Sequence, residues 1–250
     1  MPKITEIFFD CDNTLVLSEE LAFEACADLA NEILEKQNLP VRYTGDELIS
    51  DFVGQNFRGM MESLQAKFKF DLTKDELEAY VTKEEDKVIA KLLEKARPCV
   101  GATEQVEKLF EEKKYDLAVV SSSALRRVRA SIEKVGQDKY FDYDKVFSAA
   151  TSLPTPTSKP NPAIYLHALE KCGKKAEETI TVEDSISGSL SAIRANIAVI
   201  GYVGSYPGEE KQAEMAQRLT ELGVQVIMKD WSEFPQCLKE LENRTVTPVL

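Results

Sequence analysis

The chain has 250 residues, 43% hydrophobic and 30% charged, which is typical of a soluble globular protein with room for one large domain or a domain carrying an insertion. Acidic residues outnumber basic ones by 43 to 31, a formal net charge of −12, which argues against a broad surface for nucleic acid or an anionic membrane. A small phosphorylated substrate needs only a few local positive groups and is not excluded.

The cysteines and the N-terminus indicate a cytoplasmic setting. The five cysteines are scattered and form no C-x-x-C pair, so we expect neither disulfides nor a cysteine zinc site. The single histidine, His167, excludes a histidine-rich zinc site. The first residues lack the features of a signal peptide, and no segment approaches the length of a membrane span. We expect a monomer or a weak dimer.

The first third of the chain predicts one strand followed by helices. The apolar run Ile4–Phe9 predicts a buried strand, and Ser18 is the expected N-cap of a helix whose apolar residues recur at helical spacing. Further helices are predicted over Gly45–Phe52, Phe57–Phe70 and Thr73–Ala96, with almost no strand signal among them.

Beyond this helical region, strands alternate with helices. The predicted strands are Leu117–Val120, Val146–Ser148, Thr179–Val182, Ile197–Ile200 and Val224–Met228. The predicted helices are Thr103–Lys114, Leu125–Val135, Asn161–Lys171, Ser185–Ala195, Glu209–Leu222 and Phe234–Leu241. This alternation predicts an α/β fold, with a Rossmann-like, three-layer parallel sheet as its core.

The helical region then forms an insertion placed directly after the first strand. We expect an α/β core domain from residues 1–15 and 98–250, and a smaller all-helical cap domain from residues 16–97. Because both ends of the insertion must return to the carboxyl end of the first strand, it should lie over that end as a lid.

Two aspartates stand at that strand end, in Asp10-Cys11-Asp12-Asn13-Thr14. Ligands bind at the carboxyl ends of parallel strands, and residues two apart project to the same side of an extended chain. Like charges held so close raise one another's pKa unless a cation or a proton separates them, so the pair could hold a hard cation and supply a nucleophile and a proton donor. These residue types are also ordinary in turns and helix caps, so the spacing alone leaves a structural interpretation open.

Ser121-Ser122-Ser123 and Lys159 could bind the phosphate of such a substrate. The serines follow a predicted strand and offer hydroxyls and backbone N–H groups suited to an anion, although a simple serine cap would look the same. Lys159 precedes a predicted helix and could reach inward to neutralise a phosphate and a crowded carboxylate, or it could be a solvated loop residue.

A second acidic pair, Glu183 and Asp184, ends another predicted strand. With Asp10 it could complete an oxygen-only site for Mg²⁺, which prefers oxygen ligands and keeps several waters. The alternative is that Asp184 caps the helix that follows and adds favourable charge to its first turn.

In chain order these segments resemble the motifs of the haloacid dehalogenase-like superfamily, in the phosphatase and β-phosphoglucomutase-like branch, whose helical cap is inserted after the first motif. The resemblance covers essentially the whole chain, and the segments that carry it are Asp10–Thr14, Ser121, Ser158–Tyr165 and Glu183–Gly188. Asn13 stands where glycine is commoner, and Asn161 and Ala163 depart from a frequent Pro-Asp form. Asp12 argues against a dehalogenase, since enzymes of that kind typically lack this acid.

The resemblance implies a role for each matched residue. Asp10 would be the nucleophile that becomes a phosphoaspartate, and Asp12 the general acid and base. Mg²⁺ would be held by Asp10, the main-chain carbonyl of Asp12 and Asp184, with Glu183 supporting it through water. The remaining residues would bind phosphoryl oxygens or steady the loop, namely Ser121, Ser122 and Lys159 for the oxygens and Thr14 for the loop or Asp12.

We therefore predict a Mg²⁺-dependent phosphatase of a small metabolite, of the sugar phosphate or phosphoglycolate type. A β-phosphoglucomutase-like mutase uses the same four motifs, so the cap must decide between them. Within the cap, Gly54–Gly59 is the most suggestive segment, and its Arg58 could contact substrate or be a solvated helix residue. A catalytically silent binding module is a third possibility, but such a protein should have lost a catalytic group, and none is missing here.

Overall fold

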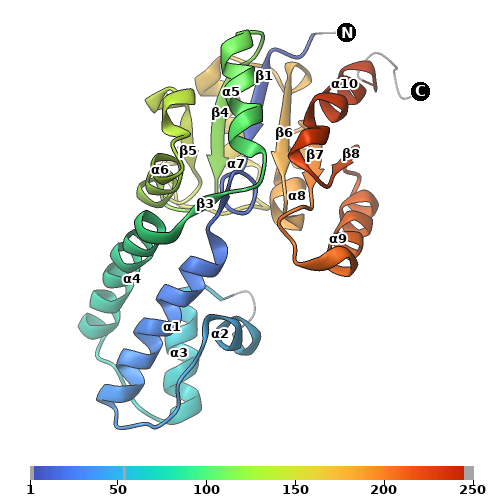
Figure 1. Ribbon diagram of the computed structural model, residues 1–250. Helices are drawn as coiled ribbons and strands as arrows, with labels where there is room; N and C mark the ends of the chain where they lie inside the picture. The colour runs from blue at the N-terminus through green and yellow to red at the C-terminus, as the bar shows by residue number, and fades with distance from the viewer. Residues whose placement is uncertain (1–2, 53–54, 245–250) are drawn as a thin grey trace. The chain divides into compact units, whose positions relative to one another are not determined.

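The computed structural model describes residues 3–52 and 55–244 (Figure 1). Its internal contacts form two compact units, which we call the core unit (Met1–Leu17 with Arg97–Leu250) and the helical unit (Ser18–Ala96). The predicted boundary assigned strands β2 (Val16–Leu17) and β3 (Arg97–Pro98) largely to the insertion, but the two pair with one another, antiparallel, within the core unit. That residues 16–97 act as a cap domain stays a prediction.

The core unit is built on a six-stranded sheet in the order β5-β4-β1-β6-β7-β8, with every neighbouring pair parallel. Its strands are β1 (Glu6–Phe9), β4 (Asp116–Ser121), β5 (Val146–Ser148), β6 (Thr179–Glu183), β7 (Ala198–Tyr202) and β8 (Val226–Met228). This confirms the predicted parallel α/β fold. Because β1 lies between β4 and β6, the strand order reverses beside it, and such a switch point opens a crevice at the carboxyl ends of the strands.

Helices cover both faces of this sheet (Figure 1). One face packs against α7 (Ala163–Cys172), α8 (Ile186–Arg194) and α9 (Gly208–Leu222). The other carries α5 (Ala102–Glu112) and α10 (Phe234–Arg244), while α6 (Leu125–Lys134) contacts β5. Alternation along β1 explains both layers, since the Phe8 ring stacks on Tyr165 of α7 and the Phe9 ring packs on Trp231 and Phe234.

The helical unit contains the four predicted helices, α1 (Glu19–Lys36), α2 (Gly45–Asp51), α3 (Phe57–Phe68) and α4 (Lys74–Lys95). Capping boxes at Thr44 and Thr73 begin α2 and α4, whereas Ser18 occupies the N-cap position of α1 without a side-chain cap bond. The unit buries an apolar core of its own, to which α1, α2, α3 and α4 all contribute. None of the helices described is both long enough and apolar enough to span a membrane.

A buried carboxyl group, Glu6, begins strand β1 at the end opposite to Asp10. Neither of its carboxylate oxygens has a nitrogen or oxygen hydrogen-bond partner; Nζ of Lys174 lies 3.8 Å from Oε2 and pairs more closely with Asp116 at 2.7 Å. Burial raises the pKa of Glu6 from 4.5 to about 7, although Lys145 and Lys174 oppose the increase.

This pKa makes the stability of the fold depend on pH. Between pH 4.5 and about 7 folded Glu6 keeps a proton that the unfolded chain has released, so its contribution is greatest below this window and falls as pH rises through it. The shift corresponds to a loss of at most about 3 kcal/mol. In urea unfolding, we expect Glu6→Gln to gain stability relative to wild type between pH 5 and pH 8. The same difference at both pH values would contradict the prediction.

Candidate active site

Asp10 and Lys159 form a buried ion pair where β1 ends. The backbone N–H of Asp10 donates to the Val182 carbonyl of β6 at 3.0 Å, which places the residue at the switch point of the sheet. The Lys159 ammonium donates to Asp10 Oδ1 at 2.6 Å, to Glu183 Oε1 at 2.6 Å and to the Val120 carbonyl at 2.7 Å. All three of its protons therefore have acceptors, and with a side chain only 3% exposed it is not a solvated loop residue.

Burial and charge shift the pKa values of this pair strongly. Burial raises the pKa of Asp10; Lys159 opposes the increase, and the carboxylates of Glu183 and Asp12 add to it. Burial alone would lower the pKa of Lys159, but Asp10 and Glu183 outweigh it and raise that pKa well above its usual range. The lysine thus stays charged, and a crowded set of carboxyl groups depends on it for compensation.

The carboxylate of Asp12 has different partners, the hydroxyls that follow β4. Ser121 Oγ donates to its Oδ2 at 3.2 Å and Ser123 Oγ at 2.7 Å. The N-cap of α6 is Ala124, without a side-chain cap bond, so these serines are not a helix cap. Ser123 was predicted only as part of the serine run and was given no role of its own, because nothing in a run of three serines shows that the first and the third contact Asp12.

The chain turns within the first motif, between Cys11 and Val16. The backbone N–H groups of Leu15 and Val16 both donate to the Cys11 carbonyl, and Asn13 has a left-handed backbone with φ +57°. Glycine adopts this conformation most readily and asparagine tolerates it, which accounts for Asn13 where the resemblance favours glycine. The strand thus ends at Phe9, and the turn begins directly after it.

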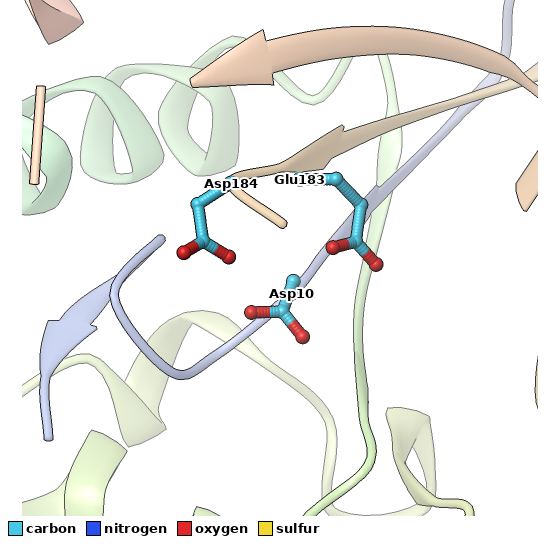
Figure 2. A group of neighbouring side chains, drawn as sticks. All are labelled: Asp10, Glu183 and Asp184. Atoms are coloured by element: carbon cyan, nitrogen blue, oxygen red, sulfur yellow. The ribbon is translucent and has the colours of Figure 1, made fainter. Parts of the chain in front are cut away.

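Three carboxyl groups, those of Asp10, Glu183 and Asp184, face a shared space (Figure 2). One oxygen from each can be chosen so that all three lie within 4.8 Å of one another. The cap of α8 is Ser185, whose Oγ accepts from the Gly188 N–H at 3.0 Å, so Asp184 is not the helix cap. Thr14 Oγ1 donates to Asp184 Oδ1 at 3.4 Å, so Thr14 lies beside Asp184, whereas the resemblance had suggested that it steadies the loop or Asp12.

This donor set fits a hard cation. All three groups offer carboxylate oxygen, and Glu183 Oε2 is buried without a hydrogen-bond partner. The structure thus gathers Asp10 and Asp184, two of the predicted metal ligands, together with Glu183. The side chain of Asp12 is not part of the cluster, and the resemblance assigns only its main-chain carbonyl to the metal.

Glu183 has two close neighbours, Tyr165 and Gly188, that lie in the matched segments but were given no role from the sequence. The Tyr165 hydroxyl donates to Glu183 Oε1 and lies 3.1 Å from Thr181 Oγ1. Gly188 packs so closely on the Glu183 carboxyl that a Cβ there would overlap it. In the sequence Tyr165 looks like one more core residue of an apolar helix, and it is the fold that brings it to an acid 18 positions away.

The remaining predicted residues lie in two places. Ser122 Oγ accepts the Lys159 backbone N–H at 3.1 Å, so Ser122 lies beside the lysine. Arg58 belongs to the helical unit, where its guanidinium makes two bonds of 2.7 Å to the exposed carboxylate of Glu78. Gly54, the first residue of that candidate segment, lies outside the described residues, and a contact between Arg58 and substrate stays a prediction.

Comparison with known proteins places this geometry in context. Residues 7–202 match the family model described as haloacid dehalogenase-like hydrolase. The chain is 27% identical over 199 residues to the 6-phosphogluconate phosphatase of Escherichia coli, covering 80% of this chain and 82% of the relative. It is 32% identical over 198 residues to the phosphorylated carbohydrates phosphatase of Thermotoga maritima, covering 76% and 81%. A family IA hydrolase from Entamoeba histolytica superposes with a TM-score of 0.76 at 22% identity, covering 98% of this chain and all of that one, and shares the fold.

Proposed function

The chain belongs to the haloacid dehalogenase-like hydrolases, and from that premise we propose that it is a Mg²⁺-dependent phosphatase of small phosphorylated metabolites. One observation carries the proposal, namely the buried ion pair of Lys159 and Asp10 at the end of the central strand, beside Glu183 and Asp184. A carboxylate held by a lysine next to an acidic, oxygen-only cluster suits nucleophilic attack on a phosphate ester.

Mg²⁺ would be held by Asp10, Asp184 and the main-chain carbonyl of Asp12, with Glu183 as support. Its contribution would be to neutralise the negative charge of the phosphoryl oxygens. Glu183 Oε1 already accepts a hydrogen bond from Lys159. Its other carboxylate oxygen, Oε2, has no hydrogen-bond partner and could accept from a water bound to the metal.

In the first step, an Asp10 carboxylate oxygen attacks phosphorus as the bond to the leaving oxygen breaks, and Asp12 donates a proton to that oxygen. Ser123 would hold Asp12 in place, and the single hydroxyl proton of Ser121 would pass from Asp12 to a phosphoryl oxygen when substrate binds. Ser121, Ser122 and Lys159 would donate to the phosphoryl oxygens. Since all three protons of Lys159 already have acceptors, the lysine would share or exchange its bond to Asp10 when it binds a phosphate.

In the second step, Asp12 accepts a proton from a water molecule, whose oxygen attacks the phosphorus of the phosphoaspartate. The bond between phosphorus and the Asp10 oxygen breaks, which releases inorganic phosphate and restores the carboxylate. Asp12 thus returns to its protonated state, and both aspartates are ready for another cycle.

The relatives support a phosphorylated sugar or sugar acid as the substrate class. Two of them are phosphatases of 6-phosphogluconate and of phosphorylated carbohydrates. The net charge of −12 disfavours large polyanions such as nucleic acids. The five cysteines are all free in the structure, which supports a proposed cytoplasmic setting.

A panel of phosphate esters tests this function. With Mg²⁺ we expect release of inorganic phosphate from one or more sugar phosphates or from phosphoglycolate, and loss of that release when EDTA is added. Product analysis on hexose 1-phosphates would identify a mutase by the appearance of the 6-phosphate. If no ester in the panel released phosphate or was isomerised, the proposed function would be wrong, and a binding module would be favoured.

A further inference from the structure

We propose that Tyr165 is a positioning residue for the phosphoryl-transfer site, because it fixes the Glu183 carboxylate that holds Lys159 against Asp10. The proposal rests on the proposed phosphatase function. It concerns a residue that contacts no reacting atom and acts through two others, along the chain of bonds from Tyr165 to Glu183 to Lys159.

The Tyr165 hydroxyl lies in a buried, ordered sequence of hydrogen bonds. The residue is 0% exposed, and its ring stacks on Phe8 at a centroid distance of 6.2 Å. A hydroxyl has a single proton, so if Tyr165 donates to Glu183 Oε1, then Thr181 Oγ1 must be the donor in the 3.1 Å bond between the two hydroxyls. Thr181 lies on β6. The hydrogen bonds therefore run from the Thr181 hydroxyl on the sheet to the Tyr165 hydroxyl, and from there to the Glu183 carboxylate.

Glu183 depends on this bond for its orientation. Its Oε1 accepts from both Tyr165 and Lys159, whereas its Oε2 has no hydrogen-bond partner. Without the tyrosine proton, Oε1 would be held by the lysine alone. The carboxylate could then follow a moving ammonium and would no longer oppose its displacement.

Lys159 in turn depends on Glu183 for one of its three acceptors. The Val120 carbonyl is fixed by β4, while the bond to Asp10 is the one that must change when a phosphoryl oxygen arrives. At that moment Val120 and Glu183 are the two acceptors of the ammonium that do not change. A rigid Glu183 therefore matters most with phosphate bound, and a packing role for Tyr165 predicts no such dependence.

Replacing Tyr165 with phenylalanine separates the two roles, because the buried ring remains and only the hydroxyl is lost. We expect Tyr165→Phe to lower kcat about tenfold and to weaken the binding of inorganic phosphate by a similar factor, as the loss of one hydrogen bond to a charged group would do. Phosphate affinity is measured by calorimetry with Mg²⁺ present, in addition to kcat on the best ester of the panel.

Tyr140→Phe is the matched control. Tyr140 is also a buried residue of the core unit, and its hydroxyl donates to an acid, Glu107 Oε1, at 2.6 Å in a partly buried bond. Its loss should lower the free energy of unfolding and leave kcat and phosphate affinity unchanged. Thr181→Val should act in the same direction as Tyr165→Phe, and the double variant should be no worse than Tyr165→Phe alone.

The outcomes separate this proposal from the proposed function. A Tyr165→Phe protein that is less stable but has wild-type kcat and phosphate affinity would show a packing role only and overturn the proposal. If wild type hydrolyses no ester, the phosphatase function fails. In that case calorimetry alone tests the role of Tyr165. Equal phosphate affinity in wild type and in Tyr165→Phe would overturn the proposed positioning role.

Discussion

The Asp10→Asn protein is expected to lose Mg²⁺-dependent hydrolysis of p-nitrophenyl phosphate, with kcat lowered by at least about 1,000-fold. An amide is a poor nucleophile and carries no charge, so neither the attack on phosphorus nor the ion pair with Lys159 survives. Asparagine has nearly the same shape, and Lys159 keeps its bonds to Val120 and Glu183, so the fold should remain intact. Steady-state kinetics checks the loss, and urea unfolding checks the fold.

Asp12→Asn is the informative control, because the two aspartates have different partners. Asp10 is paired with Lys159, whereas Asp12 accepts from Ser121 and Ser123. p-Nitrophenolate leaves readily without a proton, so the first step should survive in Asp12→Asn while the attack of water lacks its base. We expect a burst of one equivalent of p-nitrophenol from Asp12→Asn and none from Asp10→Asn. Wild-type activity in Asp10→Asn would rule out this mechanism.

The strand ends of the site were predictable from the sequence because each follows a short apolar run that is typical of a buried strand. Asp10, Ser121 and Glu183 each come directly after or at the end of such a run, and parallel strands bring their carboxyl ends to one edge. The order of the strands was not predictable, because buried parallel strands look alike in sequence. The short pair β2 and β3 was missed for a related reason, since two-residue strands have no period to detect.

The contacts that refine the site depend on residues distant in sequence. Asn161 illustrates the local limit: its Oδ1 accepts the Ala163 N–H at 3.0 Å, so α7 begins at Ala163 and not at the predicted Asn161. Tyr165 illustrates the tertiary limit, because an apolar helix position reveals neither the depth of the hydroxyl nor the acid that it meets. In both cases a side-chain hydrogen bond determines the feature, the start of α7 or the contact of Tyr165 with Glu183. The spacing of apolar residues along the sequence does not report such bonds.

Gly188→Ala should destabilise the fold and impair catalysis, although alanine is the better helix former. Gly188 lies in the first turn of α8 and is not among the glycines with a left-handed backbone, so its conformation does not require glycine. The lack of space does require glycine. An ideal Cβ at this position would lie within 3.0 Å of the carboxyl atoms of Glu183, closer than real Cβ atoms approach other atoms.

The overlap can be relieved only by moving part of the site. If the Glu183 carboxylate moves, it takes away the acceptor that Lys159 and Tyr165 share; if α8 moves, Asp184 at its start moves with it. Overpacking of this kind costs about 1–3 kcal/mol of stability. A displacement of about 1 Å at a catalytic group costs about 100-fold in rate. At an open helix position the same substitution would stabilise by about 1 kcal/mol, so the sign of the change is itself diagnostic.

A double-mutant cycle with Glu183→Ala tests the cause. Alanine at 183 removes the carboxyl that a Cβ at 188 would meet, so Gly188→Ala should cost little stability, or gain some, in the Glu183→Ala background. Urea unfolding of the four proteins measures this coupling, and independent, additive costs would show that Glu183 is not what excludes a side chain at 188. A strong coupling would mean that Gly188 leaves room for the carboxylate that holds Lys159, so that the glycine serves the site without contacting substrate.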